Sequence, residues 1–352
     1  MGAPDAAAFT AAEDHIVHQL LADYGALVRR EVLACLPSGE PAPYLYDLLA
    51  EYPKRGGKMV RSCLCLATAH AFGAALEDAL PSAVAIELLH NALLIHDDIE
   101  DSSDERRGQP TLHARYGIPL ALNAGDALSL LCLRPLRGTA TRLGASVALR
   151  IMEETERMAW ETVEGQALEL GWRHDNRAEL ADEDYLLMVL KKTCWLTTIH
   201  PMRVGALIGA GKAAPLDALI RLGFFAGAAF QIQDDLLNLE GGSAYGKERD
   251  GDLLEGKRTL MVIHTLRESG ARDRKRLLRY LATPRDDRKP RETAWVRSLL
   301  DTHGSLDYAR RIAKGLAGAA IYEFDNAFAS VAESRDRTFV RALLGWVLRR
   351  SK

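Results

Sequence analysis

The sequence predicts an all-α protein, a single-domain bundle of about ten or more helices around a central cavity. Apolar residues recur at three- and four-residue intervals through most of the chain. Ala and Leu are abundant, and the alternation of β-branched residues that is typical of strands is almost absent. These observations favour amphipathic helices over any strand-rich module.

The predicted helices follow one another with short breaks. In order along the chain they are Ile16–Leu33, Ser62–Phe72, Pro81–Ile95, Leu122–Leu133, Val147–Leu170, Asp184–Ile208, Pro215–Leu239 and Lys257–Leu266. The breaks are rich in Gly, Pro and charged residues, and the charged loop 284–290 precedes a terminal helical region. We find no internal repeat, so residues 1–352 are predicted to form one domain, with residues 1–12 as a flexible segment.

Composition excludes several classes of protein. The net charge is −3, and nucleic-acid binding would need a basic excess. The five cysteines are scattered, with no spacing typical of a disulfide framework or a zinc site. No signal peptide is recognised, and the most apolar run, Gly223–Ile232, is too short to span a membrane. We therefore expect a cytoplasmic protein without a membrane span.

The first candidate site is an acidic cluster at the end of an apolar helix. Asp97 and Asp98 follow the apolar run Ala92–Ile95, and Asp101 lies one turn after Asp97. Two carboxylates at this spacing repel each other, but a divalent cation bound between them would make the arrangement favourable. Magnesium prefers oxygen ligands from one or two carboxylates, completed by water and phosphates. The alternative is that these aspartates simply form a solvated helix end. A solvated acidic segment directly after so apolar a helix would be unusual, which favours the metal site.

A second acidic cluster has the same arrangement. Asp234 and Asp235 end the apolar helical run Leu222–Phe230, and Asn238 lies one turn after Asp234. Two such clusters facing each other across a bundle would hold metal ions on a diphosphate from both sides. The ions would stabilise the charge that develops as a C–O bond breaks.

Basic groups surround both clusters. One basic group, upstream of the first acidic cluster, begins with the glycine pair Gly56–Gly57. Such a pair lets the backbone approach a phosphate closely. The groups are Gly56–Arg61, Arg106–Arg107, Lys191–Lys192, Lys247 and Gly256–Arg258. Any one of them would be an ordinary solvated charge, but five groups flanking two acidic motifs indicate a site for anions.

These residues resemble the trans-isoprenyl diphosphate synthases, the polyprenyl synthetase family, and geranylgeranyl diphosphate synthases within it. The resemblance runs from about Gly56 to Thr259. Its most specific motifs are HDDIEDSSDERRGQPTLH, FQIQDDLLNL and GKERDGDLLEGKRT. It implies the isoprenoid synthase fold, a homodimer, and three magnesium ions.

The resemblance implies a role for each matching residue. Asp97, Asp101 and Asp234 would hold the magnesium ions, with Asp98 and Asp235 supporting them. The residues that would contact the allylic diphosphate are Arg106, Lys192, Lys247 and Lys257. Those that would bind isopentenyl diphosphate are Lys58, Arg61, His90 and Arg107. Thr193 and Gln231 match positions that line the reacting allyl group.

The implied reaction is prenyl transfer in the trans configuration. An allylic diphosphate (dimethylallyl, geranyl or farnesyl) ionises, isopentenyl diphosphate attacks the cation head to tail, and a proton is lost. The protein would contribute electrostatics, positioning and exclusion of water. Three residues depart from the family pattern: Met59 replaces a usual basic residue, Ser62 a usual proline and Asn238 a usual third Asp.

Product length is expected to depend on the helix before Asp97, along which the growing tail would run. Ala92 is small where makers of short chains often have an aromatic residue, and Leu93 and Leu89 are of medium size. This pattern predicts a C20 product, geranylgeranyl diphosphate, with longer chains as the alternative and C15 less favoured.

Two other functions fit part of the pattern. A class I terpene cyclase shares the fold and one Asp-rich motif, but it would have no use for Lys58, Arg61, His90 and Arg107. A non-catalytic partner subunit of a prenyl synthase would be expected to have eroded Asp motifs, and both Asp pairs are intact here.

Overall fold

The computed structural model describes residues 10–240 and 250–349, and it confirms the predicted all-α class. In those ranges the only strands form the two-residue hairpin β1–β2. The elements are α1 (Ala11–Cys35), η1 (Ala42–Tyr44), α2 (Tyr46–Lys54), α3 (Val60–Ala71), α4 (Leu76–Glu100), β1 (Glu105–Arg106), β2 (Gln109–Pro110), α5 (Leu112–Tyr116), α6 (Ile118–Leu131), α7 (Leu133–Leu143), α8 (Ala145–His174), α9 (Asp182–Val189), η2 (Leu190–Ile199), α10 (His200–Ala210), η3 (Gly211–Ala213), α11 (Leu216–Glu240), α12 (Gly251–Glu255), α13 (Leu260–Glu268), α14 (Ala271–Ala282), η5 (Arg285–Asp287), α15 (Pro290–Thr302), α16 (Ser305–Ala327) and α17 (Arg335–Arg349).

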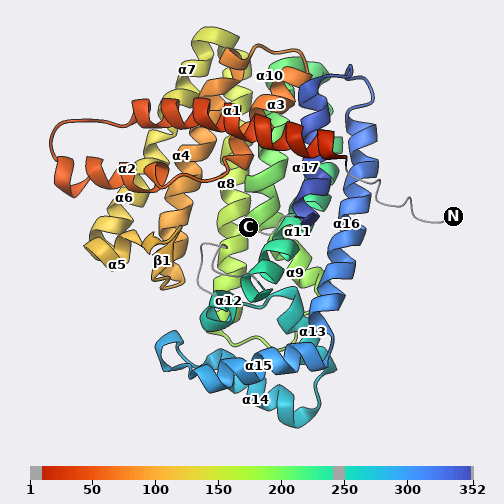
Figure 1. The fold of residues 1–352 in the computed structure, drawn as a ribbon. Helices are drawn as coiled ribbons and strands as arrows, with labels where there is room; N and C mark the ends of the chain where they lie inside the picture. Colours follow the sequence, from red (N-terminus) through yellow and green to blue (C-terminus); the bar gives the residue numbers. More distant parts are fainter. Residues whose placement is uncertain (1–9, 241–249, 350–352) are drawn as a thin grey trace.

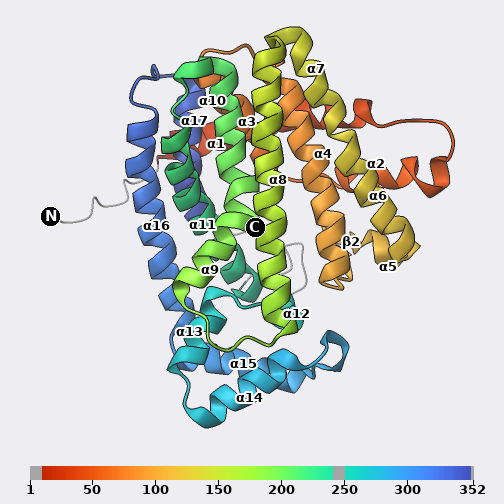
Figure 2. The same ribbon diagram turned by 180° about the vertical axis from the view of Figure 1, so that it is seen from behind.

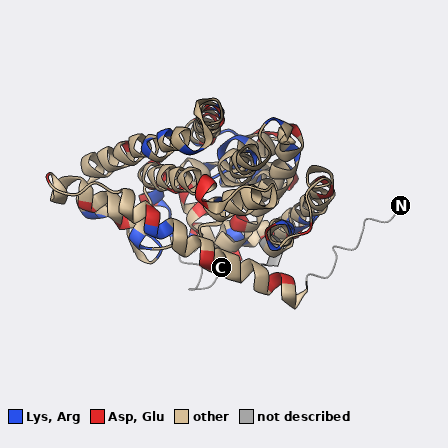
Figure 3. Ribbon diagram, turned by 90° about the horizontal axis from the view of Figure 1, so that it is seen from above, with Lys and Arg blue, Asp and Glu red and all other residues tan. Residues whose placement is uncertain are grey.

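The long helices run roughly alongside one another. In Figure 1, α4, α8, α11 and α16 stand upright, and α1 crosses them near one end of the bundle. Figure 2 shows the same bundle from behind, with α8 in front and the small helices α13, α14 and α15 gathered at the opposite end. Seen from above, acidic and basic residues are interspersed over the helices, in keeping with the net charge of −3 (Figure 3).

Local sequence explains where α1 begins. Thr10 accepts a hydrogen bond from the backbone N–H of Glu13, and the Glu13 side chain accepts one from the backbone of Thr10. This capping box satisfies backbone N–H groups that have no partner within the helix. The segment predicted to be flexible includes Thr10–Ala12, which belong to this helix start, whereas residues 1–9 lie outside the described part.

The region predicted as one helix, Asp184–Ile208, is continuous but changes its winding. Between α9 and α10 the segment η2 is a ten-residue π-helix, and such wide turns often occur at functional sites. The neighbouring helices approach η2 closely. A Cβ on Gly165 of α8 would come within 2.2 Å of the Lys192 backbone nitrogen. On the other side, Gly227 of α11 would bring a Cβ within 2.9 Å of the Cys194 Cα. Glycines therefore let α8 and α11 pack directly on η2.

Among the described residues α4, and not the helix that contains the Gly223–Ile232 run, is long and apolar enough to cross a membrane by length and composition. Of its most apolar window of 18 residues, 67% is buried inside the protein. The apolar composition of α4 is explained by burial on both sides, because α4 packs between α3 and α6. It is a core helix, and its C-terminal end carries the first acidic cluster.

Candidate active site

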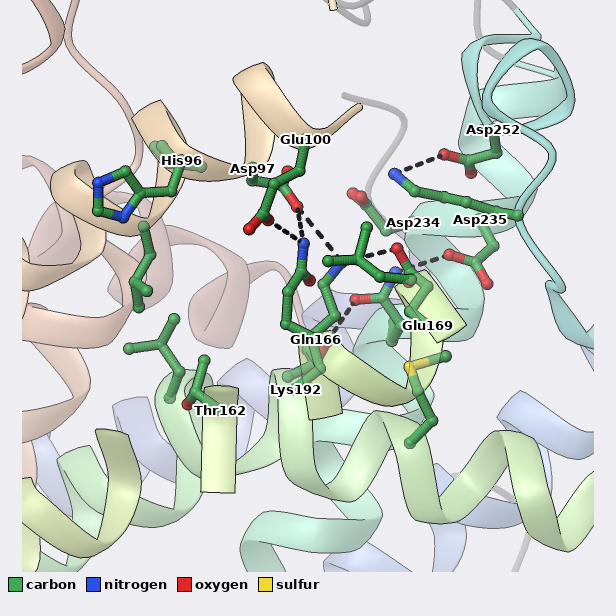
Figure 4. A pocket seen from close by; sticks show the side chains of 18 of the residues that line it. His96, Asp97, Glu100, Thr162, Gln166, Glu169, Lys192, Asp234, Asp235 and Asp252 are labelled. Carbon is green, nitrogen blue, oxygen red and sulfur yellow. Dashed lines mark hydrogen bonds and ion pairs between the residues drawn. The ribbon is translucent and has the colours of Figure 1, made fainter. Parts of the chain in front are cut away.

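A cavity of about 390 Å³ opens between the C-terminal ends of α4 and α11. The residues that line it come from α3, α4, β1, α8, α9, η2, α11, α12 and the loop before α13. They include His90, Leu93, Asp97, Glu100, Arg106, Gln166, Glu169, Lys192, Thr193, Gln231, Asp234, Asp235 and Lys257. The structure thus brings both predicted acidic clusters into one cavity, as Figure 4 shows.

The three aspartates at the end of α4 have different surroundings. Asp97 lines the cavity. Asp98 is buried, and both of its oxygens accept from Arg106 Nε, at 2.7 and 2.8 Å, while one also accepts from the Tyr52 hydroxyl. This pairing links α4 to the β-hairpin and to α2. Asp98 therefore holds Arg106 at the cavity wall.

Asp101 is buried and paired with two cations. Its oxygens accept from Arg173 and from Lys257, the latter at 2.7 Å. Burial alone would raise the pKa of Asp101, but Lys257 and the other nearby cations hold it below the ordinary value. The carboxylate is therefore ionised at neutral pH.

In the second cluster, Asp234 lines the cavity and Asp235 is buried at its edge. Asp235 accepts hydrogen bonds from the Tyr185 hydroxyl at 2.8 Å and from Gln231 Nε2 at 2.6 Å. Burial raises the pKa of Asp235 to about 7. Thr193 donates to Gln231 Oε1 at 2.9 Å, so the chain Thr193–Gln231–Asp235–Tyr185 fixes the amide beside the cavity.

Asn238 has a structural task. Its Oδ1 accepts from the backbone N–H of Asp252 at 3.0 Å, which ties the end of α11 to the start of α12. Asp252 in turn contributes a carboxylate to the cavity lining.

Two half-buried lysines lie among the carboxylates. Lys192 donates to Asp97 at 3.3 Å and to Glu169 at 2.9 Å (Figure 4). Lys257 contacts Asp101 at 2.7 Å and Glu255 at 2.6 Å. Burial would lower the pKa of both lysines, but their carboxylate neighbours raise it above the ordinary value. Both are therefore charged at neutral pH. Lys247 lies outside the described residues.

The four residues predicted to bind isopentenyl diphosphate differ in how they lie relative to the cavity. Arg61 and His90 line the cavity and lie 3.4 Å apart, between Nη1 and Nε2. Burial, and then the charge of Arg61, lowers the pKa of His90 well below its usual value, so the imidazole is neutral. Arg107 donates to the carbonyls of Gly56 and Tyr52. Lys58 does not line the cavity; it is exposed, and its ammonium lies 5.0 Å from the centre of a Trp346 ring of α17.

Of the three residues expected to set product length, only Leu93 lines the cavity. Ala92 and Leu89 are buried in the hydrophobic core. The remaining apolar wall is formed by neighbours from several helices, namely Leu94, Val163, Ala167, Leu170, Met188, Leu196 and Phe230.

Several residues of the site were not identified from the sequence. On α8, Gln166, Glu169 and Arg173 face the first acidic cluster, and Gln166 Nε2 lies 2.5 Å from Glu100 Oε2. Their spacing of three and four residues is a polar stripe that helical periodicity alone could have revealed. Tyr52 and Tyr185 were missed because nothing local marks a tyrosine whose partner is distant in sequence.

The donor chemistry fits magnesium. Asp97, Asp101 and Asp234 offer hard carboxylate oxygens, and Asp97 and Asp234 border the same cavity. In the described part of the chain, no three acidic, His or Cys side chains converge closely enough to enclose an ion by themselves.

Comparison with known proteins agrees with this geometry. A family model described as polyprenyl synthetase matches residues 42–299. The geranylgeranyl pyrophosphate synthase of Geoglobus acetivorans is 34% identical over 253 residues, covering 72% of this chain and 77% of that protein. The geranylfarnesyl diphosphate synthase of Natronomonas pharaonis is 33% identical over 321 residues, covering 86% and 89%.

Solved structures give the same result for the fold. The crystal structure of geranylgeranyl pyrophosphate synthetase from Pyrococcus horikoshii Ot3 superposes with a TM-score of 0.82 at 30% identity, covering 95% of this chain and 99% of that one. The predicted fold is therefore confirmed over nearly the whole length.

Proposed function

Because this chain belongs to the polyprenyl synthetase family, we propose that it condenses isopentenyl diphosphate with an allylic diphosphate, head to tail and in the trans configuration. The observation that carries the proposal is the pairing of two sites. Carboxylates and lysines, among them Asp97, Asp234 and Lys257, line one part of the cavity. A separate group that includes Arg61 and His90 lines another part. Two diphosphates need two such sites.

The allylic diphosphate is proposed to bind between the acidic clusters. Magnesium, expected as three ions held by Asp97, Asp101 and Asp234, would neutralise the departing diphosphate when bound. Arg106, Lys192 and Lys257 would contact the same group, since each supplies a buried or half-buried cation at the cavity wall. Lys247 is proposed for the same role by resemblance alone.

The allyl group is proposed to lie next to Thr193 and Gln231. Their hydroxyl and amide oxygens carry partial negative charge, and the bond from Gln231 to Asp235 holds the amide in one orientation. A fixed dipole stabilises a developing carbocation without reorganisation. Lys58, Arg61, His90 and Arg107 would hold the isopentenyl diphosphate so that its double bond faces this carbon.

We propose a C20 product. Leu93, rather than Ala92 or Leu89, would contact the tail, because it alone of the three lines the cavity. The relatives include both geranylgeranyl and geranylfarnesyl synthases, so a C25 product is the nearest alternative.

A second copy of the chain is proposed to cover an exposed apolar face. Met152, Trp160 and Val163 follow one face of α8, and Leu122 and Leu130 one face of α6; Trp160 is 64% and Leu130 70% exposed. In Figure 2 these two helices lie on either side of α4. Large apolar side chains on neighbouring surface helices are typical of an interface. Because Val163 also lines the cavity, the second copy would cover part of its wall.

The proposed compartment is the cytoplasm. All five cysteines are free, and four of them are buried. Thiols that form no disulfide suit a reducing environment.

A direct assay tests the function. The purified chain is incubated with magnesium, labelled isopentenyl diphosphate and each allylic primer in turn. Elongated diphosphates support the proposal. A hydrocarbon made from one allylic diphosphate alone would point to a terpene cyclase, and no product from any primer would point to a non-catalytic partner subunit.

A further inference from the structure

The glycine-lysine loop Gly56–Lys58 lacks the basic residue that usually follows its lysine. Met59 occupies that position, and it is 7% exposed. Its side chain turns into the core toward α1, where Gly25 would bring a Cβ within 3.5 Å of the Met59 Cβ. Met59 therefore contributes packing to the contact with α1 and no charge to the site.

A cation reaches the same loop from α1. Arg29 lies one turn after Gly25, on the same face of the helix. Its Nη2 donates to the Gly57 carbonyl at 3.2 Å and lies 3.6 Å from the position that a Cβ on Gly56 would take. The Arg29 guanidinium thus lies directly against the glycine pair.

Arg107 approaches the same glycine pair. It donates to the Gly56 carbonyl, and a Cβ on Gly57 would come within 2.7 Å of its Nη2. Only glycine at position 57 admits this approach. The two carbonyls of the pair are therefore each bound by a different guanidinium, one from α1 and one from the β-hairpin loop.

Positive charge is concentrated here. Burial lowers the pKa of Arg107, and after the opposing effect of Glu87 the guanidinium groups of Arg106, Arg29 and Arg55 lower it further. Such like-charge crowding destabilises the site without a ligand, and a bound polyanion relieves it. The Arg29 Nε is buried and has no hydrogen-bond partner among the described residues.

We infer that Arg29 is a further binding residue for the diphosphate of isopentenyl diphosphate, and that it supplies the charge that Met59 does not. This inference rests on the proposed function. It assigns a role to the N-terminal helix, which none of the motifs recognised in the sequence includes. A guanidinium can donate to two phosphate oxygens at once, so Arg29 can keep its bond to Gly57 and still contact the ligand.

The test compares Arg29→Gln with Arg30→Gln. Arg30 is the next residue on α1, is exposed, and pairs with the adjacent Glu31. For Arg29→Gln we expect the KM for isopentenyl diphosphate to rise about tenfold, the size of one charged hydrogen bond. The kcat and the KM for the allylic diphosphate should stay near the wild-type values, and Arg29→Lys should recover part of the loss. Arg30→Gln should change none of these values.

A merely structural Arg29 would give a different pattern. Equal changes for both substrates, a loss of kcat alone, or an unchanged KM for isopentenyl diphosphate would each overturn the inference. Calorimetric titration with isopentenyl diphosphate keeps the test independent of turnover. If the wild-type chain elongates nothing, the proposed function fails, whereas the inference on Arg29 still stands or falls on whether Arg29→Gln weakens this binding and Arg30→Gln does not.

Discussion

Lys257 Nζ and Asp101 Oδ2 lie 2.7 Å apart, although the two residues are 156 positions apart in the sequence. The ion pair joins the C-terminal end of α4 to the loop that precedes α13 and closes one end of the cavity. Glu255 lies 2.6 Å from the same ammonium, and burial raises its pKa to about 7. Lys257 is therefore a shared counterion of Asp101 and Glu255 beside the proposed allylic site.

Replacing Lys257 with Gln should lower kcat/KM for elongation by about a hundredfold or more, because a diphosphate contact is lost where water is excluded. It should also lower the free energy of unfolding, since Asp101 and Glu255 lose a buried counterion. Steady-state kinetics and urea unfolding measure the two effects. Lys212→Gln, at an exposed position, is the control; wild-type kinetics in Lys257→Gln would contradict the assigned role.

Product length should respond to Leu93 more than to Ala92. Leu93→Phe would fill part of the cavity and is expected to shorten the main product. Ala92→Phe would insert a ring into a fully buried position and should destabilise the fold by about 1–3 kcal/mol. Chromatography of dephosphorylated products, with thermal unfolding alongside, separates the outcomes. A shorter product from Ala92→Phe together with no change from Leu93→Phe would show that Ala92, and not Leu93, limits the tail.

Stability should fall as the pH drops from about 6.5 to 4, and His200 should account for part of the fall. Burial lowers the pKa of His200 to about 4, and the imidazole Nε2 lies 3.1 Å from the Thr155 hydroxyl. In this range the unfolded chain takes up a proton that the folded chain does not, which amounts to about 3 kcal/mol at pH 4. His200→Gln should flatten the pH dependence of the unfolding free energy. Parallel wild-type and variant profiles would rule this out.

The oligomeric state should depend on Trp160. A charge introduced by Trp160→Glu in the centre of the α8 apolar face should shift the protein to monomers, measured by light scattering after gel filtration. Tyr322→Glu is the matched control, because Tyr322 is similarly exposed, at 68%, but lies on α16. A wild-type chain that is already monomeric, or an equal effect of both substitutions, would remove the proposed interface.

The sequence predicted most of the fold because long amphipathic helices reveal themselves by local periodicity. It also placed the Asp clusters at helix ends, where the structure brings Asp97 and Asp234 to one cavity. It did not reveal the π-helical winding around Lys192. That winding accompanies the close packing of α8 and α11 on η2, which Gly165 and Gly227 allow. Nor did it separate Leu93 from Ala92, because a local pattern does not determine which face of a fully buried helix borders the cavity.

The central claim is that one chain holds two diphosphates in two separate sites, and binding stoichiometry tests it most directly. The chain is titrated calorimetrically with a non-reactive thio analogue of farnesyl diphosphate, with and without magnesium, and then with isopentenyl diphosphate. We predict one equivalent of each ligand bound together, with only the first requiring magnesium, because Lys58, Arg61, His90 and Arg107 offer cations and a neutral imidazole rather than metal ligands. Mutually exclusive binding of the two diphosphates would contradict the account.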